Sequence, residues 1–372
     1  MKIFKPLLFV FALFMGTNLS AQNAHWSLYD YAPTFVNAAT TGNFLGTLRV
    51  GGIYRDQARS ALGAGAYSTP LVFVDAPILA IGKRDWIGVG ATVWNDTAGK
   101  FDRGETGFLI SAAYHHPLDK KSKNVISFGL QGGNVQQRID LLSSSSDQDF
   151  ASEILSNTAG TSQDRSTYNI PDQGQGAFNM LNLGVTLKSQ LSKLSDMTIG
   201  LAAAGINTDN YSTDMTAVGA NQGFFGFGNT GTAGQLIRPR ITLNGQYNQT
   251  LKSNKRLSIS PSAIVNLYSG WTEINAQAWM GYKIKDTTDK KNPSTSDLKL
   301  LGGLGYRVGD AVQVLLGAEF NNLTKVAFSW DITTSQLRSA TGVGGAFELG
   351  VSHRINVYKK PEVKPAILCP QM

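Results

Sequence analysis

The chain has 372 residues, of which 40 are glycine and only 16% are charged, and its formal net charge is +7. Ordinary soluble domains carry ~25% charged residues, so this composition is unusual for them. The basic residues are scattered and form no stripe with interleaved aromatic residues, which argues against a nucleic-acid-binding protein. The sole cysteine, Cys369, excludes an internal disulfide.

The first 21 residues have the features of a secretory signal peptide. Lys2 and Lys5 form a basic start, an apolar run extends from Leu7 to Met15, and small and polar residues lead to Ala21. The apolar run is too short to span a bilayer, which takes ~20 helical residues. We expect cleavage after Ala21 and export across the inner membrane of a bacterium.

Long segments of alternating apolar and polar residues follow. In 178–188, leucine and valine alternate with asparagine, glycine, threonine and lysine, and 257–267, 274–284 and 347–357 alternate in the same way. A period of two predicts a strand whose two faces meet different surroundings. Segments of ~10 residues match a tilted membrane-spanning strand better than the ~5–6 residues usual in soluble sheets.

A soluble β-sandwich would alternate as well, but its outer faces would carry many lysines and glutamates. Here the polar face is mostly Asn, Gln, Ser, Thr and Gly with isolated charges such as Arg240, which suits a wet lumen. Aromatic residues fall near segment ends, where the interfacial girdles of a membrane barrel lie. The pattern therefore predicts an all-β protein, a transmembrane antiparallel β-barrel.

The segments give an expected topology of about fourteen strands, an even number that places both termini on the periplasmic side. We expect the barrel over 45–357, an N-terminal segment at 22–44 in the periplasm or at the barrel mouth, and a periplasmic tail at 358–372. The long connections 137–176 and 209–234 then face outside. The predicted strands are 45–57, 66–81, 86–95, 107–116, 124–136, 177–189, 196–208, 235–251, 255–268, 273–285, 298–308, 311–321, 325–333 and 346–357.

Signals for catalysis, cofactors and metals are thin. His115 and His116 are adjacent in a predicted strand, so they point to opposite faces and cannot share a metal as neighbours. A lipid-modifying barrel enzyme would need a serine nucleophile within hydrogen-bond reach of a histidine near the outer rim. No spacing singles out such a pair, and we expect no catalytic, cofactor-binding or metal-binding residues.

Five stretches in chain order carry a family resemblance. They are HWSLYDYAPTFVNAATTG (25–42), RVGGIYRDQ (49–57), IGVGATVWNDTAG (87–99), AAYHHPL with SFGLQGGNVQQRID (112–118 and 127–140), and AFSWDITTSQLRSATGVGGAFELGVSHRI (327–355). Together they resemble the PorP/SprF family of type IX secretion system outer-membrane proteins. In the first stretch, Asn37-Ala38-Ala39 stands where the family has an Asn-Pro-Ala element.

The resemblance implies a non-enzymatic barrel that serves secretion, gliding motility or the anchoring of large surface proteins. The implied partners are outer-membrane lipid, a secreted surface adhesin or its C-terminal domain, and periplasmic secretion-system lipoproteins or a peptidoglycan-associated protein. The candidate partner contacts are Phe224, Phe225 and Phe227 in a long connection, and Ile367, Leu368 and Cys369 in the tail. The alternatives are that the phenylalanines fold into the barrel mouth or the protein's own loops, and that the tail residues pack against the periplasmic mouth or are disordered.

A different class stays open, namely a transport channel for small hydrophobic or polar solutes. A barrel of this size can enclose a lumen, and a path for anions could be lined by Arg238, Arg240, Lys283 and Arg354. The two classes differ in the lumen: a plug without a continuous opening would argue against the channel.

Overall fold

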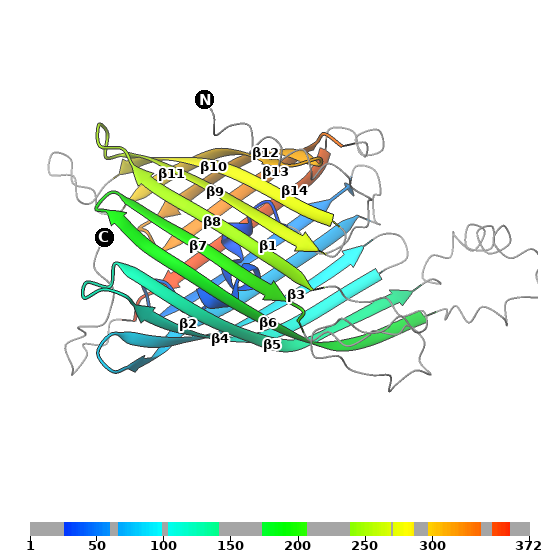
Figure 1. The fold of residues 1–372 in the computed structure, drawn as a ribbon. Coiled ribbons are helices and arrows are strands. Elements are labelled where there is room, and N and C mark those ends of the chain that lie inside the picture. Colours follow the sequence, from blue (N-terminus) through cyan, green and yellow to red (C-terminus); the bar gives the residue numbers. More distant parts are fainter. Residues whose placement is uncertain are drawn as a thin grey trace, which may run out of the picture.

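The computed structural model describes residues 26–59, 66–98, 103–140, 173–206, 239–268, 271–285, 297–335 and 344–357. These residues form fourteen β-strands that close into one antiparallel barrel (Figure 1), which confirms the predicted fold class. The strands are β1 (Leu48–Gln57), β2 (Tyr67–Ile81), β3 (Asp85–Ala98), β4 (Arg103–Pro117), β5 (Asn124–Asp140), β6 (Gln173–Ser192), β7 (Ser195–Ala204), β8 (Arg240–Thr250), β9 (Leu257–Tyr268), β10 (Trp271–Lys285), β11 (Leu298–Arg307), β12 (Ala311–Phe320), β13 (Thr324–Thr333) and β14 (Gly344–Ile355).

The barrel closes where β1 pairs with β14, from Leu48 opposite Ile355 to Gln57 opposite Ala346. Every other strand pairs with its neighbours in sequence, so the sheet has no open edge. Among the described residues, no helix is long and apolar enough to cross a bilayer.

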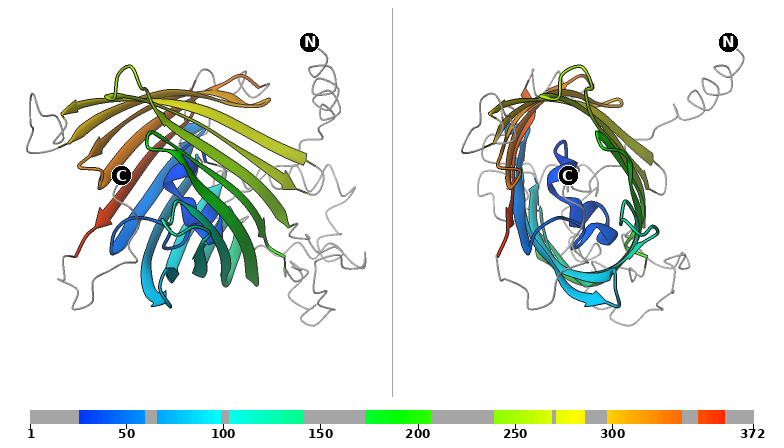
Figure 2. Two further views of the ribbon diagram at one scale, coloured as in Figure 1. Left: turned by 60° about the vertical axis from the view of Figure 1, so that its left-hand side comes forward. Right: turned by 90° about the vertical axis from the view of Figure 1, so that its left-hand side faces the viewer.

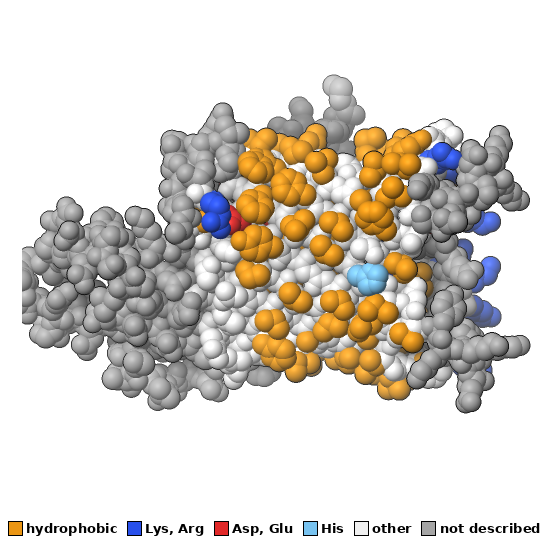
Figure 3. Space-filling view, turned by 180° about the vertical axis from the view of Figure 1, so that it is seen from behind, with side chains coloured by type: hydrophobic (Ala, Val, Ile, Leu, Met, Phe, Trp, Pro, Cys, Tyr) orange, Lys and Arg blue, Asp and Glu red, His pale blue; other side chains and the backbone are white. Residues whose placement is uncertain are grey.

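The two faces of each strand differ as the alternation predicts. In β8, Ile241 and Leu243 point outward and are 46% and 50% exposed, whereas Thr242 between them is 1% exposed. Leu183 and Asn182 of β6 show the same contrast, with 45% and 7% exposed. The outward apolar side chains form the broad orange band of Figure 3. Because a soluble protein would bury such a band, it marks the surface that meets lipid.

The two ends of the barrel carry different connections. At one end, called the turn end below, short connections such as 82–84, 193–194 and 321–323 join the strands. The same end holds the start of β1 and the end of β14, because the number of strands is even. The connections 141–172 and 207–238, which lie outside the described residues, leave from the opposite end, called the loop end below.

Residues 26–43 lie inside the ring of strands (Figure 2) and are called the plug below. The plug contains the 3-10 helix η1 (Tyr29–Tyr31), the short helix α2 (Pro33–Val36) and the 3-10 helix η2 (Ala38–Thr40). Its Trp26, Leu28, Tyr29, Tyr31 and Val36 pack with inward-facing strand residues into the hydrophobic core.

The placement of the plug differs from the expected position of residues 22–44 in the periplasm or at the mouth. A barrel of ~8 strands is filled by its own side chains, whereas a wider one leaves interior space. With fourteen strands, the N-terminal segment fills part of that space. The strand alternation predicted a polar inner face but could not show what would cover it.

Candidate functional site

At the loop end, the plug is held by two buried carboxylates. The Glu348 carboxylate accepts hydrogen bonds from the backbone N–H groups of Ser27, at 2.7 Å, and Leu28, at 2.6 Å. The Ser27 hydroxyl donates to Asp331 at 2.7 Å. Glu348 and Asp331 are 0% and 1% exposed, so these bonds form away from bulk water.

Two arginines balance these carboxylates. Arg55 of β1 contacts Glu348 and lies 3.3 Å from Asp331, while Arg307 of β11 contacts Asp331 and lies 2.6 Å from Asp310. Arg55, Arg307, Asp331 and Glu348 are called the ionic cluster below. Buried charges are tolerated when each is paired and hydrogen-bonded, and removing one partner leaves the other uncompensated. The ionic cluster therefore ties β1, β11, β13 and β14 to the plug.

In the middle of the lumen, Asn37 joins the plug to β6 and β7. Its side-chain nitrogen donates to the carbonyl oxygens of Val185, at 3.2 Å, and Leu201, at 3.3 Å. Its side-chain oxygen accepts from the N–H of Ala39 at 2.9 Å and so begins η2. One asparagine thus fixes both the local turn of the plug and its distance from the wall.

Two wall glycines allow this close approach. A Cβ atom at Gly129 would lie 2.2 Å from the Ala39 nitrogen, and one at Gly184 would lie 2.0 Å from the Asn37 side-chain oxygen. Real Cβ contacts are never this short, so any side chain here must displace the plug. The glycines of β5 and β6 are therefore part of the seat of the plug.

At the turn end, the plug is held mainly by neutral groups. His115 of β4, which is 0% exposed, binds the Thr41 carbonyl oxygen through Nε2 at 2.8 Å and the Ser127 hydroxyl through Nδ1 at 2.7 Å. The Trp86 indole donates to the Gly42 carbonyl oxygen at 3.1 Å. One ion pair assists, since Asp75 accepts from the Gly42 N–H at 2.7 Å and pairs with Arg49.

A lipid-modifying enzyme would need a serine hydrogen-bonded to a histidine base. His115 and Ser127 form such a bond, so this pair must be compared with that requirement. A carbonyl oxygen only accepts, which means that Nε2 carries the proton and Nδ1 accepts from the hydroxyl. Both side chains are 0% exposed beneath the plug, at the turn end. The pair is placed to bind the plug, and a substrate cannot reach it while the plug is present.

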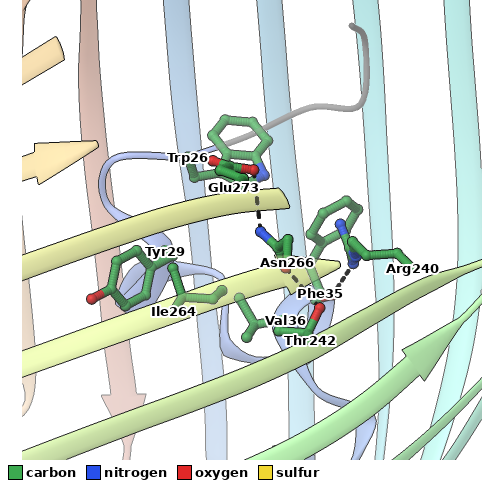
Figure 4. A pocket seen from close by; sticks show the side chains of 9 residues that line it. All are labelled: Trp26, Tyr29, Phe35, Val36, Arg240, Thr242, Ile264, Asn266 and Glu273. Carbon is green, nitrogen blue, oxygen red and sulfur yellow. Dashed lines mark hydrogen bonds between the residues drawn. The ribbon is translucent and has the colours of Figure 1, made fainter. Parts of the chain in front are cut away.

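A small cavity lies between the plug and β8–β10 near the loop end (Figure 4). The Arg240 guanidinium lies over the Phe35 ring, 5.3 Å from its centroid. On the wall, Thr242 donates to Asn266, which donates to Glu273. The cavity volume of about 20 Å³ can hold a water molecule but no organic solute.

The predicted partner contacts Phe224, Phe225, Phe227, Ile367, Leu368 and Cys369 lie outside the described residues, as does Arg238. Of the other residues proposed to line an anion path, Arg240 lies against the plug at the loop end. Lys283 and Arg354 lie on the inner wall near the turn end. These side chains are therefore divided between the two ends.

The residues that hold the plug were not singled out in the sequence. Glu348 and Asp331 both occur in the closing stretch that carries the family resemblance, and Arg55 occurs in an earlier one. A usable signal was present, because charges at inward positions of a charge-poor barrel need partners inside it. Among the residues with assigned structure, no group of three or more His, Cys, Asp or Glu side chains could hold a metal ion.

The sequence model of a protein family, described as type IX secretion system membrane protein PorP/SprF, matches residues 18–353. No curated protein matches the chain.

Several solved barrels are similar in fold. The CymD monoaromatic hydrocarbon channel has a TM-score of 0.44 at 10% identity, covering 91% of this chain and 96% of that chain. The toluene transporter TbuX of Ralstonia pickettii has a TM-score of 0.43 at 12% identity, and the match covers 87% of this chain and 94% of that chain. The toluene transporter TodX of Pseudomonas putida has a TM-score of 0.43 at 11% identity, and the match covers 91% of this chain and 94% of that chain. At these identities the likeness concerns the barrel fold alone.

Proposed function

The chain belongs to the type IX secretion system membrane protein family PorP/SprF, and we propose that it acts there as a non-enzymatic platform in the outer membrane. In this role the barrel supports the secretion or surface anchoring of large proteins with a C-terminal secretion signal, such as adhesins. The platform gives these proteins and the secretion machinery a fixed point in the membrane, and it moves no small solute through its lumen.

The observation that carries this proposal is the plug, which is bound along its length. Ser27 and Leu28 bind the ionic cluster near one end, and Thr41 and Gly42 bind His115 and Trp86 near the other. A channel for small solutes needs a continuous path through the lumen. A segment that is tied to the wall at both ends and fills part of the lumen narrows such a path, which favours a holding role over transport.

The orientation is part of the proposal. We place the turn end in the periplasm and the loop end outside, because short periplasmic turns and longer outer connections are the rule in outer-membrane barrels. The signal peptide is removed after Ala21, and the tail 358–372 extends into the periplasm. There Ile367, Leu368 and Cys369 would contact a secretion-system lipoprotein or a peptidoglycan-associated protein. On the outer side, Phe224, Phe225 and Phe227 would contact the secreted protein.

Two measurements test the platform role together. In a bacterium that makes this protein, removing the chain should abolish surface display of one or more proteins with a C-terminal secretion signal. Restoring the full chain should recover that display. The purified full chain should conduct little in planar bilayers, because the plug occupies the lumen. Unchanged display together with reduced uptake of a small solute would replace the platform with the channel.

A further inference from the structure

The two ends of the barrel differ in the kind of basic residue that they carry. Every lysine in the part of the chain that the structure describes lies at or near the turn end. Seven of these lysines are exposed on the short connections, namely Lys83, Lys120, Lys121, Lys123, Lys193, Lys252 and Lys255, and they are called the rim lysines below. Figure 3 shows blue side chains projecting beyond the hydrophobic band at this end.

The acidic residues among these connections are already engaged. Asp119 accepts hydrogen bonds from the backbone N–H groups of Lys121, at 3.2 Å, and Asn124, at 2.8 Å. Asp196 accepts from Asn248 at 2.9 Å, and Asp85 accepts from Tyr114 at 2.6 Å. Within the described residues, none of the rim lysines forms an ion pair. Among the described residues of the rim, the basic residues outnumber the carboxylates, so the rim has an excess of positive charge.

The positive charge continues onto the inner wall. The register places Lys283 of β10 opposite Lys299 of β11, Lys299 opposite Glu319, and Glu319 opposite Lys325 of β13. Arg354 of β14 lies opposite Arg49 of β1. Lys283, Lys299, Lys325 and Arg354 are called the basic row below. Among these paired positions Glu319 is the single acidic residue, so the row has a net positive charge that suits an anionic partner.

The plug leaves Lys325 of the basic row exposed, whereas Lys283, Lys299 and Arg354 are half-buried. Near the turn end its hydrogen bonds go to Arg49, Asp75, Trp86, Ser111, His115 and Ser127, which lie on β1–β5, and none that the described residues form there goes to β10–β13. The Lys325 side chain remains 46% exposed, and its contact with Glu319 is a loose 3.8 Å.

We propose that the turn end is a docking surface for an acidic segment of a water-soluble protein, which the rim lysines attract and the basic row receives inside the lumen. Surfaces of one charge sign focus the field and raise the rate at which oppositely charged partners arrive. Lipid phosphates can reach the rim from outside, but the basic row faces the lumen, away from lipid. This location favours a polypeptide. This proposal rests on the proposed function in one respect only: the orientation given there places the partner in the periplasm.

The test uses the full chain in nanodiscs of uncharged phosphatidylcholine and a fluorescent glutamate-rich peptide, with the same peptide carrying glutamine as the comparison. We expect binding of the glutamate peptide that weakens with salt, since surface charges are screened over ~10 Å at 0.1 M salt. The K299Q/K325Q variant and the K120Q/K121Q/K123Q variant should each lower the affinity by about tenfold or more. The K299R/K325R variant should retain it.

The R59Q variant is the control, because Arg59 is a basic residue at the loop end with a side chain that is 57% exposed. Resistance to SDS before heating shows that each variant is folded. The proposal is overturned if R59Q weakens binding as much as the turn-end variants, or if wild type does not prefer the glutamate peptide. Equal binding by K299Q/K325Q and wild type also overturns it. Unchanged peptide binding by K120Q/K121Q/K123Q would overturn the role of the rim lysines. None of these readouts depends on secretion, so this proposal and the platform role can fail separately.

Discussion

The two ends of the plug are held by different chemistry. At the loop end, Ser27 and Leu28 bind carboxylates that are neutralised by Arg55 and Arg307. At the turn end, the neutral side chains of His115 and Trp86 bind the backbone, and only one ion pair takes part. Between them, Gly129 and Gly184 determine the distance to the wall. The loop-end attachment depends on charge balance, whereas the rest of the seat depends on shape.

Breaking the charge balance should have the largest effect. In an E348A variant, Arg55 loses its closest carboxylate and two backbone N–H groups lose their acceptor. Removing one partner of a buried ion pair costs about 3–5 kcal/mol, so the loop-end part of the plug should detach. The measurement is labelling by a water-soluble maleimide of a cysteine introduced at Ala32, which is 0% exposed in the plug, in a chain that carries C369S. Labelling should become fast in E348A.

The matched control for this experiment is E319Q, because Glu319 also faces the lumen but has no hydrogen bond to the plug. Slow labelling in both variants would show that the ionic cluster does not hold the plug.

A substitution on the lipid face should lower the stability of the barrel without touching the plug, so it serves as a comparison for the plug variants. Arginine at Leu183, which is 45% exposed on the outer face, should destabilise the barrel by about 2–4 kcal/mol if it lies near the bilayer midplane. Arginine at Ser260, on the inner face of β9, should cost less. Asn182 is a poor comparison, because it bonds to Gln131 and Gly205. Urea unfolding in lipid vesicles measures both, and equal costs would contradict the assignment of faces.

The shape-dependent part of the seat can be tested with one methyl group. In a G129A variant the added Cβ meets the backbone of Ala39, and overpacking of this kind costs about 1–3 kcal/mol. The G302A variant is the control, because nothing lies within 4 Å of a Cβ placed there. We expect faster protease cleavage or cysteine labelling in the plug of G129A, while G302A should match wild type. Equal behaviour of the two variants would show that Gly129 does not determine the position of the plug.

The smallest expected effect lies outside the lumen, in the turn between β4 and β5. The backbone N–H groups of Asn124 and Lys121 hold the pKa of Asp119 below its ordinary value. A carboxyl with a lowered pKa stabilises the fold above its unfolded-state pKa, and this contribution is lost as the pH falls through the folded pKa. The stability difference between wild type and D119N should therefore be present at pH 7 and shrink under acid conditions. Labelling of the plug should be unaffected throughout.

The strands and their two faces could be predicted from the sequence because each face meets one solvent over its whole length. Alternation in 257–267 and 347–357 gave strands now observed at Leu257–Tyr268 and Gly344–Ile355. The predicted ends were less accurate near the loop end, for example 196–208 against Ser195–Ala204. At this end the alternation does not mark where strand hydrogen bonding stops, so 196–208 extends past the observed strand, whereas 124–136 falls short of Asn124–Asp140.

Only the tertiary structure decided what fills the lumen. A period of two shows that Asn182, Thr242 and Glu348 face inward, but it holds equally for an empty lumen and a filled one. The plug depends on contacts between residues about 300 positions apart, such as Ser27 with Asp331, with |i−j| of 304. The seat also depends on glycines, which carry no side chain to reveal what they touch. Local sequence therefore determined which residues face lipid, while barrel closure determined which inner charges meet one another and the plug.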